Sequence, residues 1–272
     1  MSGRKGRVLI VAGSDSGGGA GIQADIKTVT ALGGYAMTAI TAVTVQNTLG
    51  VSGVHAVPID IVRGQIEAVI SDLGADAWKL GMLGSAEHVR AVSDAYETFS
   101  NGATMVLDPV MVAKGGAALL ADDAVELIAT QLVPRATIVT PNAPEAARLT
   151  DMEVRDLAGQ IDAAEKLVEE LGAHAALIKG GHIDGDIIRD VLLTREGYRV
   201  FEGPRIATQA THGTGCTLAS AIAAYIAQGA SIEQAVERAR AYLIEAIRHA
   251  PGLGQGHQPL GHGWPLASKA NT

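Results

Sequence analysis

Short apolar runs alternate with longer amphipathic stretches along almost the whole chain. The runs have the length of β-strands, and the stretches repeat apolar residues at helical spacing. This alternation predicts βα units around a mostly parallel sheet. The predicted strands are Val8–Ala12, Ala36–Val45, Ala77–Leu80, Thr104–Leu107, Thr137–Val139 and Ala175–Ile178. The predicted helices are Ala20–Leu32, Ile59–Asp72, Ala86–Phe99, Asp122–Gln131, Ala143–Leu149, Gly159–Leu171, Leu218–Gln228 and Ile232–His249.

Two segments depart from this alternation. Asp190–Thr194 and Tyr198–Phe201 are separated by a short link that contains glycine, which predicts a β-hairpin and an antiparallel edge. The tail Gly252–Gly263 is rich in glycine and histidine. His257 and His262 have neither nearby cysteine nor helical spacing, so we expect a solvated loop over the site rather than a metal centre.

Composition narrows the class of protein. With 272 residues, 47% of them apolar, the chain suits one α/β domain over residues 1–272, with a core over about 8–263. A net charge of −8 and only 3% aromatic residues argue against a nucleic-acid partner. There is one cysteine and no apolar run of membrane length, and the run Val8–Ala12 is too short for a signal peptide. We expect a cytoplasmic protein with no membrane contact.

The segment Thr211–Thr217 places two glycines at the start of a predicted helix. Gly213 and Gly215 allow a tight turn and close approach to a ligand. The first amides of a helix have no partner within the helix and therefore bind anions. Gly213, Thr214, Gly215 and Cys216 are thus a candidate phosphate cradle.

Cys216, the only cysteine, falls in the first turn of that helix. The helix dipole lowers the pKa of a thiol placed there, so Cys216 is a candidate acceptor of a proton. The alternative is a small buried residue that packs a bend. The glycine-rich setting favours the chemical role.

The first predicted strand ends in a second glycine-rich segment, Ala12–Asp25. Gly13 and Gly18 have the spacing of a P-loop, but Gly19 stands where the phosphate-binding lysine belongs. The segment also fits a dinucleotide-binding pattern, yet Ala39–Val45 holds no acidic residue for a ribose. Neither well-known motif is therefore supported.

Polar and flexible side chains follow the next two strands at the sheet edge where ligands bind. The amide of Gln46 offers donors and an acceptor that match an aminopyrimidine edge, although a loop-capping glutamine is equally compatible. Met82 is a candidate wall of an aromatic pocket, or plain core filler.

Acidic and basic residues follow the later strands at the same edge. Asp108 and Glu145 are oxygen ligands suited to Mg²⁺, which needs few protein carboxylates beside substrate phosphates. Asn142 and Glu145 also have the spacing of a helix capping box. Lys179, beside two glycines, is a candidate cation for phosphate oxygens; the alternative is a solvated lysine.

Together these segments resemble the ribokinase-like small-molecule kinases, and within them the hydroxymethylpyrimidine and phosphomethylpyrimidine kinases of thiamine biosynthesis. The resemblance runs from Val8 to about Gly263. It rests on the motifs Ala12–Asp15, Gly18–Asp25, Gln46–Thr48, Gly81–Leu83, Asp108–Met111, Thr140–Glu145, Lys179–His182 and Thr211–Cys216. It implies a three-layer α/β/α sandwich whose central sheet is mostly parallel.

The resemblance also implies site roles and cofactors. The residues implied for the pyrimidine are Gln46, Gly13, Ala20 and Met82, to which we add Asp25 and Thr44. Those implied for ATP and Mg²⁺ are Lys179, Asn142 and Glu145, to which we add Asp108. The amides from Gly213 to Cys216 are implied as an anion hole. Sugar kinases of this superfamily usually carry aspartate where Cys216 stands, whereas the pyrimidine kinases carry cysteine.

The implied reaction is phosphoryl transfer from ATP to 4-amino-5-hydroxymethyl-2-methylpyrimidine, followed by a second transfer onto the monophosphate in the same site. The resemblance further implies a homodimer. A pyridoxal or pyridoxine kinase is the nearest alternative, because both substrates are planar hydroxymethyl heteroaromatics. A non-catalytic pyrimidine sensor and an NAD-dependent oxidoreductase are the more distant ones.

Overall fold

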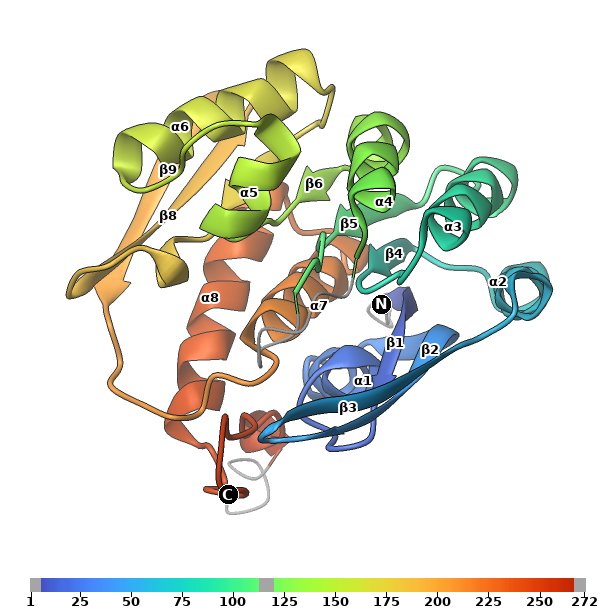
Figure 1. Ribbon diagram of the computed structural model, residues 1–272, viewed down its shortest axis with the longest axis horizontal. Helices are drawn as coiled ribbons and strands as arrows, with labels where there is room; N and C mark the ends of the chain where they lie inside the picture. The colour runs from blue at the N-terminus through green and yellow to red at the C-terminus, as the bar shows by residue number, and fades with distance from the viewer. Residues whose placement is uncertain (1–5, 113–119, 267–272) are drawn as a thin grey trace.

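The computed structural model describes residues 6–112 and 120–266, and the nine strands in these ranges form one sheet (Figure 1). Across the sheet the strand order is β3-β2-β1-β4-β5-β6-β7-β8-β9. The strands are β1 (Arg7–Asp15), β2 (Tyr35–Asn47), β3 (Gly50–Ala56), β4 (Ala77–Leu80), β5 (Thr104–Leu107), β6 (Ile138–Val139), β7 (Ala176–Ile178), β8 (Ile187–Thr194) and β9 (Gly197–Pro204). Six neighbouring strands, β2, β1, β4, β5, β6 and β7, are parallel to one another. Strand β3 at one end and the pair β8 and β9 at the other are antiparallel.

Helices cover both faces of the sheet. The helices are α1 (Gly21–Ala31), α2 (Ile59–Asp72), α3 (Ala86–Phe99), α4 (Asp122–Leu127), α5 (Ala143–Thr150), α6 (Leu157–Glu165), α7 (Thr214–Ala227) and α8 (Ile232–Arg248). One hydrophobic core lies between the sheet and α2 to α6, and a second lies between the sheet and α1, α7 and α8 (Figure 1). The predicted three-layer α/β/α architecture with a mostly parallel sheet is therefore confirmed.

The observed boundaries of three helices differ from the predicted ones by more than one residue. The predicted helices from Asp122 and from Gly159 end in π-helical turns, Ile128–Leu132 and Lys166–Glu170. Helix α7 begins at Thr214, four residues before the predicted start, because Gly213 takes a left-handed conformation with φ 81° and ends the preceding loop.

The strand β3 was missing from the prediction. Its residues include two glycines and three exposed positions in a row, Val54, His55 and Ala56, so it has no apolar alternation. Pairing with β2 supplies the hydrogen bonds that form it. The predicted hairpin is confirmed as β8 and β9, which are longer than the prediction.

The tail is solvated only in part, which corrects the expectation for Gly252–Gly263: Leu253 is 61% exposed, whereas Leu260 and His262 are buried. The His257 amide donates to the carbonyl oxygen of Thr48 at 2.8 Å. His262 is buried, and its Nε2 lies 2.9 Å from the Thr217 hydroxyl on α7. Burial and the charge of Lys27 lower the pKa of His262 to about 4, so it is neutral at physiological pH.

A buried ion pair ties the sheet to two helices. In β4, Trp78 faces the core under α2 to α6, while Lys79 points to the opposite face. Lys79 Nζ lies 2.9 Å from Asp25 Oδ2 of α1, and both side chains are 0% exposed. The Ser220 hydroxyl of α7 donates to Asp25 Oδ1 at 2.7 Å. One carboxylate therefore joins β4, α1 and α7.

No helix in the described part of the chain has both the length and the apolar composition needed to cross a membrane.

Replacement of Asp25 by asparagine is expected to lower the free energy of unfolding by roughly 3–5 kcal/mol, because Lys79 then remains as a buried, uncompensated cation. Urea unfolding of wild type and variant measures the loss. Glu153→Gln, which breaks an exposed pair with Arg155, is the control and should change little. The double variant Asp25→Leu, Lys79→Met should recover part of the loss. A stability equal to wild type for Asp25→Asn would contradict the buried ion pair.

Candidate active site

A cavity of about 640 Å³ runs along the carboxyl ends of the parallel strands. The predicted site residues that line it are Gly13, Ala20, Thr44, Gln46, Met82, Asp108, Asn142, Glu145, Lys179, Gly213, Thr214, Gly215 and Cys216. Asp25 is the exception, since it lies beneath the cavity in the ion pair with Lys79. A direct contact of Asp25 with substrate is therefore not supported, and Lys79 lines the cavity in its place.

Two glycine-rich turns meet at the candidate phosphate cradle, Gly213–Cys216. A Cβ on Gly213 would overlap the carbonyl oxygen of Gly19, so only glycine allows the turn before α7 to pack against the turn before α1. Thr217 N donates to Gly213 O at 2.9 Å and begins the helical pattern of α7. The amides of the first turn of α7 therefore face the cavity edge, as an anion site requires.

The expectation that the helix N-terminus lowers the pKa of the Cys216 thiol is wrong. Burial raises the pKa of the thiol to about 12, with Lys79 opposing the shift and Asp25 and Asp108 adding to it. The amide of Gly21 also lowers it, but the sum of burial and the two carboxylates is larger. In the free protein Cys216 is a neutral thiol.

Lys179 lies beside two acidic residues, Asp108 after β5 and Glu145 in the first turn of α5. Its Nζ lies 2.9 Å from Asp108 Oδ1 and 3.9 Å from Glu145 Oε2. Burial works against the cation, but Asp108 and Glu145 outweigh it and raise the pKa of Lys179. The sequence placed these three residues at one edge of the sheet, and the structure brings them into contact.

Asn142 and Glu145 form the predicted capping box of α5. The Asn142 side chain accepts from the Glu145 amide at 2.9 Å, and Glu145 Oε2 accepts from the Asn142 amide at 2.8 Å. Burial raises the pKa of Glu145 to about 7, Lys179 opposes the rise, and Asp108 adds to it. The capping role does not prevent Glu145 from facing the cavity.

The donors present fit a magnesium ion held mainly by phosphates. No group of three His, Cys, Asp or Glu side chains within residues 6–112 and 120–266 forms a self-sufficient metal site. Mg²⁺ keeps most of its water and needs only one or two carboxylates beside substrate phosphates. Asp108 and Glu145 are such a pair, both lining the cavity beside Lys179.

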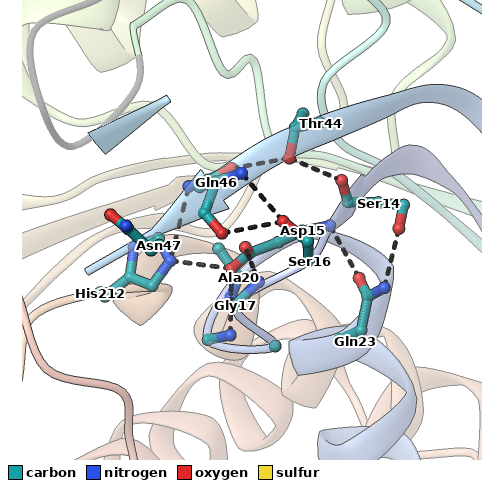
Figure 2. Close-up of polar contacts among 12 residues, drawn as sticks. Ser14, Asp15, Ser16, Gly17, Ala20, Gln23, Thr44, Gln46, Asn47 and His212 are labelled. Atoms are coloured by element: carbon teal, nitrogen blue, oxygen red, sulfur yellow. Dashed lines mark hydrogen bonds and ion pairs between the residues drawn. The ribbon is translucent and has the colours of Figure 1, made fainter. Parts of the chain in front are cut away.

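A polar network in the cavity lining contains two residues without a predicted role, Asp15 and His212 (Figure 2). Asp15 accepts from the amides of Gly19 and Ala20 and from His212 Nε2. Gln46 lies next to this network, as Figure 2 shows. Both residues belong to the motifs quoted above, but nothing in their spacing indicated that they would pair across 197 positions of the chain.

The cavity also extends to a region that was not predicted as a site. Its lining there includes Ile206 after β9 and Leu243 and Ile247 on α8. Arg240 Nε donates to Asp190 Oδ2 at 2.7 Å, and Asp190 Oδ1 accepts from the Gly180 amide at 2.8 Å beside Lys179. For this segment the sequence predicted only a helix, Ile232–His249.

A sequence profile of phosphomethylpyrimidine kinases matches residues 15–261. The chain belongs to this kinase family. The family match leaves the dinucleotide pattern at Gly19–Ala24 without support.

Close relatives of this phosphomethylpyrimidine kinase family member carry related names. The chain is 48% identical to the hydroxymethylpyrimidine/phosphomethylpyrimidine kinase of Bacillus subtilis, over 98% of this chain and 97% of that protein. It is 51% identical to the thiamine biosynthesis bifunctional protein ThiED of Geobacter sulfurreducens, over 95% of this chain but only 52% of that longer protein.

Solved structures of kinases share the fold. The pyridoxal kinase of Staphylococcus aureus, in complex with AMP-PCP and pyridoxal, matches with a TM-score of 0.86 and 34% identity, over 95% of this chain and 93% of that one. The phosphomethylpyrimidine kinase of Clostridium difficile matches with a TM-score of 0.79 and 40% identity, over 89% of this chain and 100% of that one. The predicted ribokinase-like fold is confirmed.

The Cys216 thiol is expected to react slowly with iodoacetamide at pH 8, because only the thiolate is nucleophilic and the pKa of about 12 leaves almost none of it. The alkylation rate should keep rising above pH 9, where a free cysteine approaches its plateau near its pKa of about 8.5. Mass spectrometry of the quenched protein measures the rate, with glutathione as the reference thiol. A plateau below pH 8 would show instead that the helix N-terminus dominates.

Proposed function

We propose that this phosphomethylpyrimidine kinase family member transfers phosphate from ATP to 4-amino-5-hydroxymethyl-2-methylpyrimidine and then to its monophosphate. The observation that carries the proposal is one cavity lined both by a hydrogen-bonding amide, Gln46, and by the cation Lys179, which lies beside Gly215 at the start of α7. The first group suits a planar heterocycle, and the second suits transferring phosphate.

Phosphoryl transfer passes through a loose transition state, so positioning and charge stabilisation count for more than the strength of a base. Lys179 and the first amides of α7 supply positive charge where the oxygens of the transferred group would lie. When bound, Mg²⁺ neutralises the phosphate oxygens, and Asp108 and Glu145 are the residues that would hold it. The neutral Cys216 thiol would orient the accepting hydroxyl as a hydrogen-bond partner rather than act as a preformed thiolate base. The hydroxyl proton then passes to an oxygen of the transferred phosphoryl group as the new P–O bond forms.

The second transfer uses the same groups. A phosphate replaces the neutral hydroxymethyl oxygen as acceptor, so the site must hold additional negative charge. Lys179 and the Gly213–Cys216 amides border the cavity and serve both poses. This accounts for two sequential reactions in one site without a second cation cluster.

A pyridoxal or pyridoxine kinase remains the second candidate function. Pyridoxal kinases of Staphylococcus aureus and Bacillus subtilis superpose with TM-scores of 0.86 and 0.87, compared with 0.79 for the Clostridium difficile phosphomethylpyrimidine kinase. Sequence identity runs in the opposite direction, at 34% and 35% against 40%. We give identity more weight because specificity depends on side chains, whereas backbone similarity reports the shared fold.

An ADP-release assay with Mg²⁺ and ATP, with products counted by mass, is expected to show two successive phosphate additions to the pyrimidine. Lys179→Met should lose at least about a hundredfold in both additions, because a preorganised cation is removed from the transition state. Lys166→Met, outside the cavity, is the matched control. A higher kcat/KM for pyridoxal would assign the second candidate function, and pyrimidine binding without turnover would identify a sensor.

Binding of Mg²⁺–ADP is expected to weaken as the pH falls below about 7, by up to about tenfold per pH unit, because protonated Glu145 must release its proton to face the cation. Glu145→Gln should abolish this part of the pH dependence. Calorimetric titration of both proteins at each pH removes the contribution of the nucleotide's own protonation, which is common to them. Equal slopes for wild type and Glu145→Gln would contradict a role for Glu145 at the metal.

We also propose that the kinase acts as a homodimer in the cytoplasm. The β2 and β3 ribbon exposes Val43 and Val45 on the face that points away from the cavity, with Val45 64% exposed, and Leu49 follows at its turn. Exposed apolar side chains gathered on one strand are typical of an interface. Sedimentation velocity that returned only monomer at micromolar concentration would rule out the homodimer.

A further inference from the structure

The carboxylate of Asp15 is saturated with hydrogen-bond donors. Oδ1 accepts from the Gly17 amide at 2.8 Å, and Oδ2 accepts from the amides of Gly19 and Ala20 at 3.0 and 2.8 Å (Figure 2). His212 Nε2 lies 2.8 Å from the same Oδ2, and both side chains are buried. Burial alone would favour a protonated carboxyl, but His212 and the amides lower the pKa of Asp15. Asp15 is therefore an acceptor at every contact, and His212 carries its proton on Nε2.

This proton restricts the neighbouring amide. The side-chain nitrogen of Gln46 is placed 3.5 Å from His212 Nε2. A ring nitrogen that donates to Asp15 has no lone pair left to accept from Gln46. Two donors then face each other, so the amide atom that suits this position is the oxygen.

Thr44 leads independently to the same orientation. Its hydroxyl has one proton, and it lies 2.9 Å from the carbonyl oxygen of Ser14 and 3.1 Å from Oε1 of Gln46. One proton cannot serve two acceptors fully. If Gln46 turns its nitrogen toward Thr44, the amide donates to the hydroxyl oxygen while the hydroxyl donates to Ser14. A half-turn of the Gln46 amide thus satisfies Thr44 and removes the contact between two donors at His212, whose single Nε2 proton stays on Asp15. Hydrogen-bond partners decide such orientations.

The oriented amide keeps one N–H and one oxygen lone pair for a ligand in the cavity, which Gln46 lines. An aminopyrimidine presents a ring nitrogen that accepts and an adjacent amino group that donates. The corresponding pyrimidinone presents the reverse, a ring N–H beside a carbonyl. An amide held in one orientation distinguishes these two edges, whereas an amide free to turn accepts both.

We propose that His212, held by Asp15, is a positioning residue that fixes the Gln46 amide and so determines selectivity for the aminopyrimidine edge. This inference rests on the proposed pyrimidine kinase function. The same contact also joins the turn before α1 to the loop before α7, and a purely structural tie is the alternative. The two roles differ because a tie supports every substrate equally.

The test compares 4-amino-5-hydroxymethyl-2-methylpyrimidine with its 4-oxo analogue. For wild type and for His212→Leu, calorimetry measures both dissociation constants without ATP, and the kinase assay measures kcat and KM. We expect the preference of wild type for the amino compound to fall by about tenfold or more in His212→Leu, through Kd and KM rather than kcat. His212→Gln, which retains an N–H within reach of Asp15, should restore most of the preference.

His257→Leu is the matched control, because this exposed histidine lies 3.1 Å from the Thr211 hydroxyl of the same loop and is not among the residues labelled in the network of Figure 2. It should leave the preference unchanged. Equal losses for both ligands in His212→Leu would establish a structural tie and overturn the inference. A preference in Kd that wild type shows and His212→Leu loses, without turnover by either protein, would support the inference while counting against the kinase function.

A measurement on the wild type keeps the inference open to refutation if His212→Leu does not fold. Long-range ¹H–¹⁵N NMR reports which ring nitrogen of a histidine carries the proton. We expect a protonated Nε2 on His212 between pH 7 and 8. A bare Nε2 would remove the constraint on Gln46 and overturn the inference.

Discussion

The buried ion pair between Lys79 and Asp25 is the contact on which the geometry of the site depends. It joins the central strand β4 to α1, and through Ser220 to α7. The first turn of α7 holds the candidate phosphate cradle Gly213–Cys216, and the turn before α1 packs against it. Because an uncompensated charge at this depth is costly, the three elements are held in one relative position. Asp25 thus acts through the fold, beneath the cavity.

Competition between burial and neighbouring charge determines which groups are ionised around the cradle. Lys179 remains a cation because Asp108 and Glu145 lie beside it and outweigh burial. Cys216 has Lys79 nearby, but burial and two carboxylates prevail and the thiol stays neutral. The site therefore stores positive charge in a lysine and in backbone amides, which suits a reaction that depends on charge stabilisation more than on a strong base.

The strand order explains why ligand groups from distant segments meet. The strand order reverses between β1 and β4, which is the switch point of the sheet. From there the chain adds β2 on one side of β1, and β4, β5, β6 and β7 on the other. At such a point the connections diverge to opposite faces and leave a crevice at the carboxyl ends. Gly13 and Gln46 reach this crevice from one side, and Met82, Asp108 and Lys179 from the other. The contact between Asp15 and His212 joins the two glycine-rich turns beside this crevice.

Local patterns in the sequence predict the helices and every strand except β3, and they group most of the residues that line the cavity. Apolar periodicity is a local property, and in a parallel sheet the residues that follow each strand must gather at one edge, so Gln46, Asp108, Glu145 and Lys179 could be grouped before their distances were known. Only the tertiary structure decided the charge states and the cross-chain pairs. Burial sets the pKa of Cys216 at about 12, and it depends on every neighbour at once. The Asp15 to His212 contact and the buried part of the tail join segments far apart in the chain, and no local pattern carries that information.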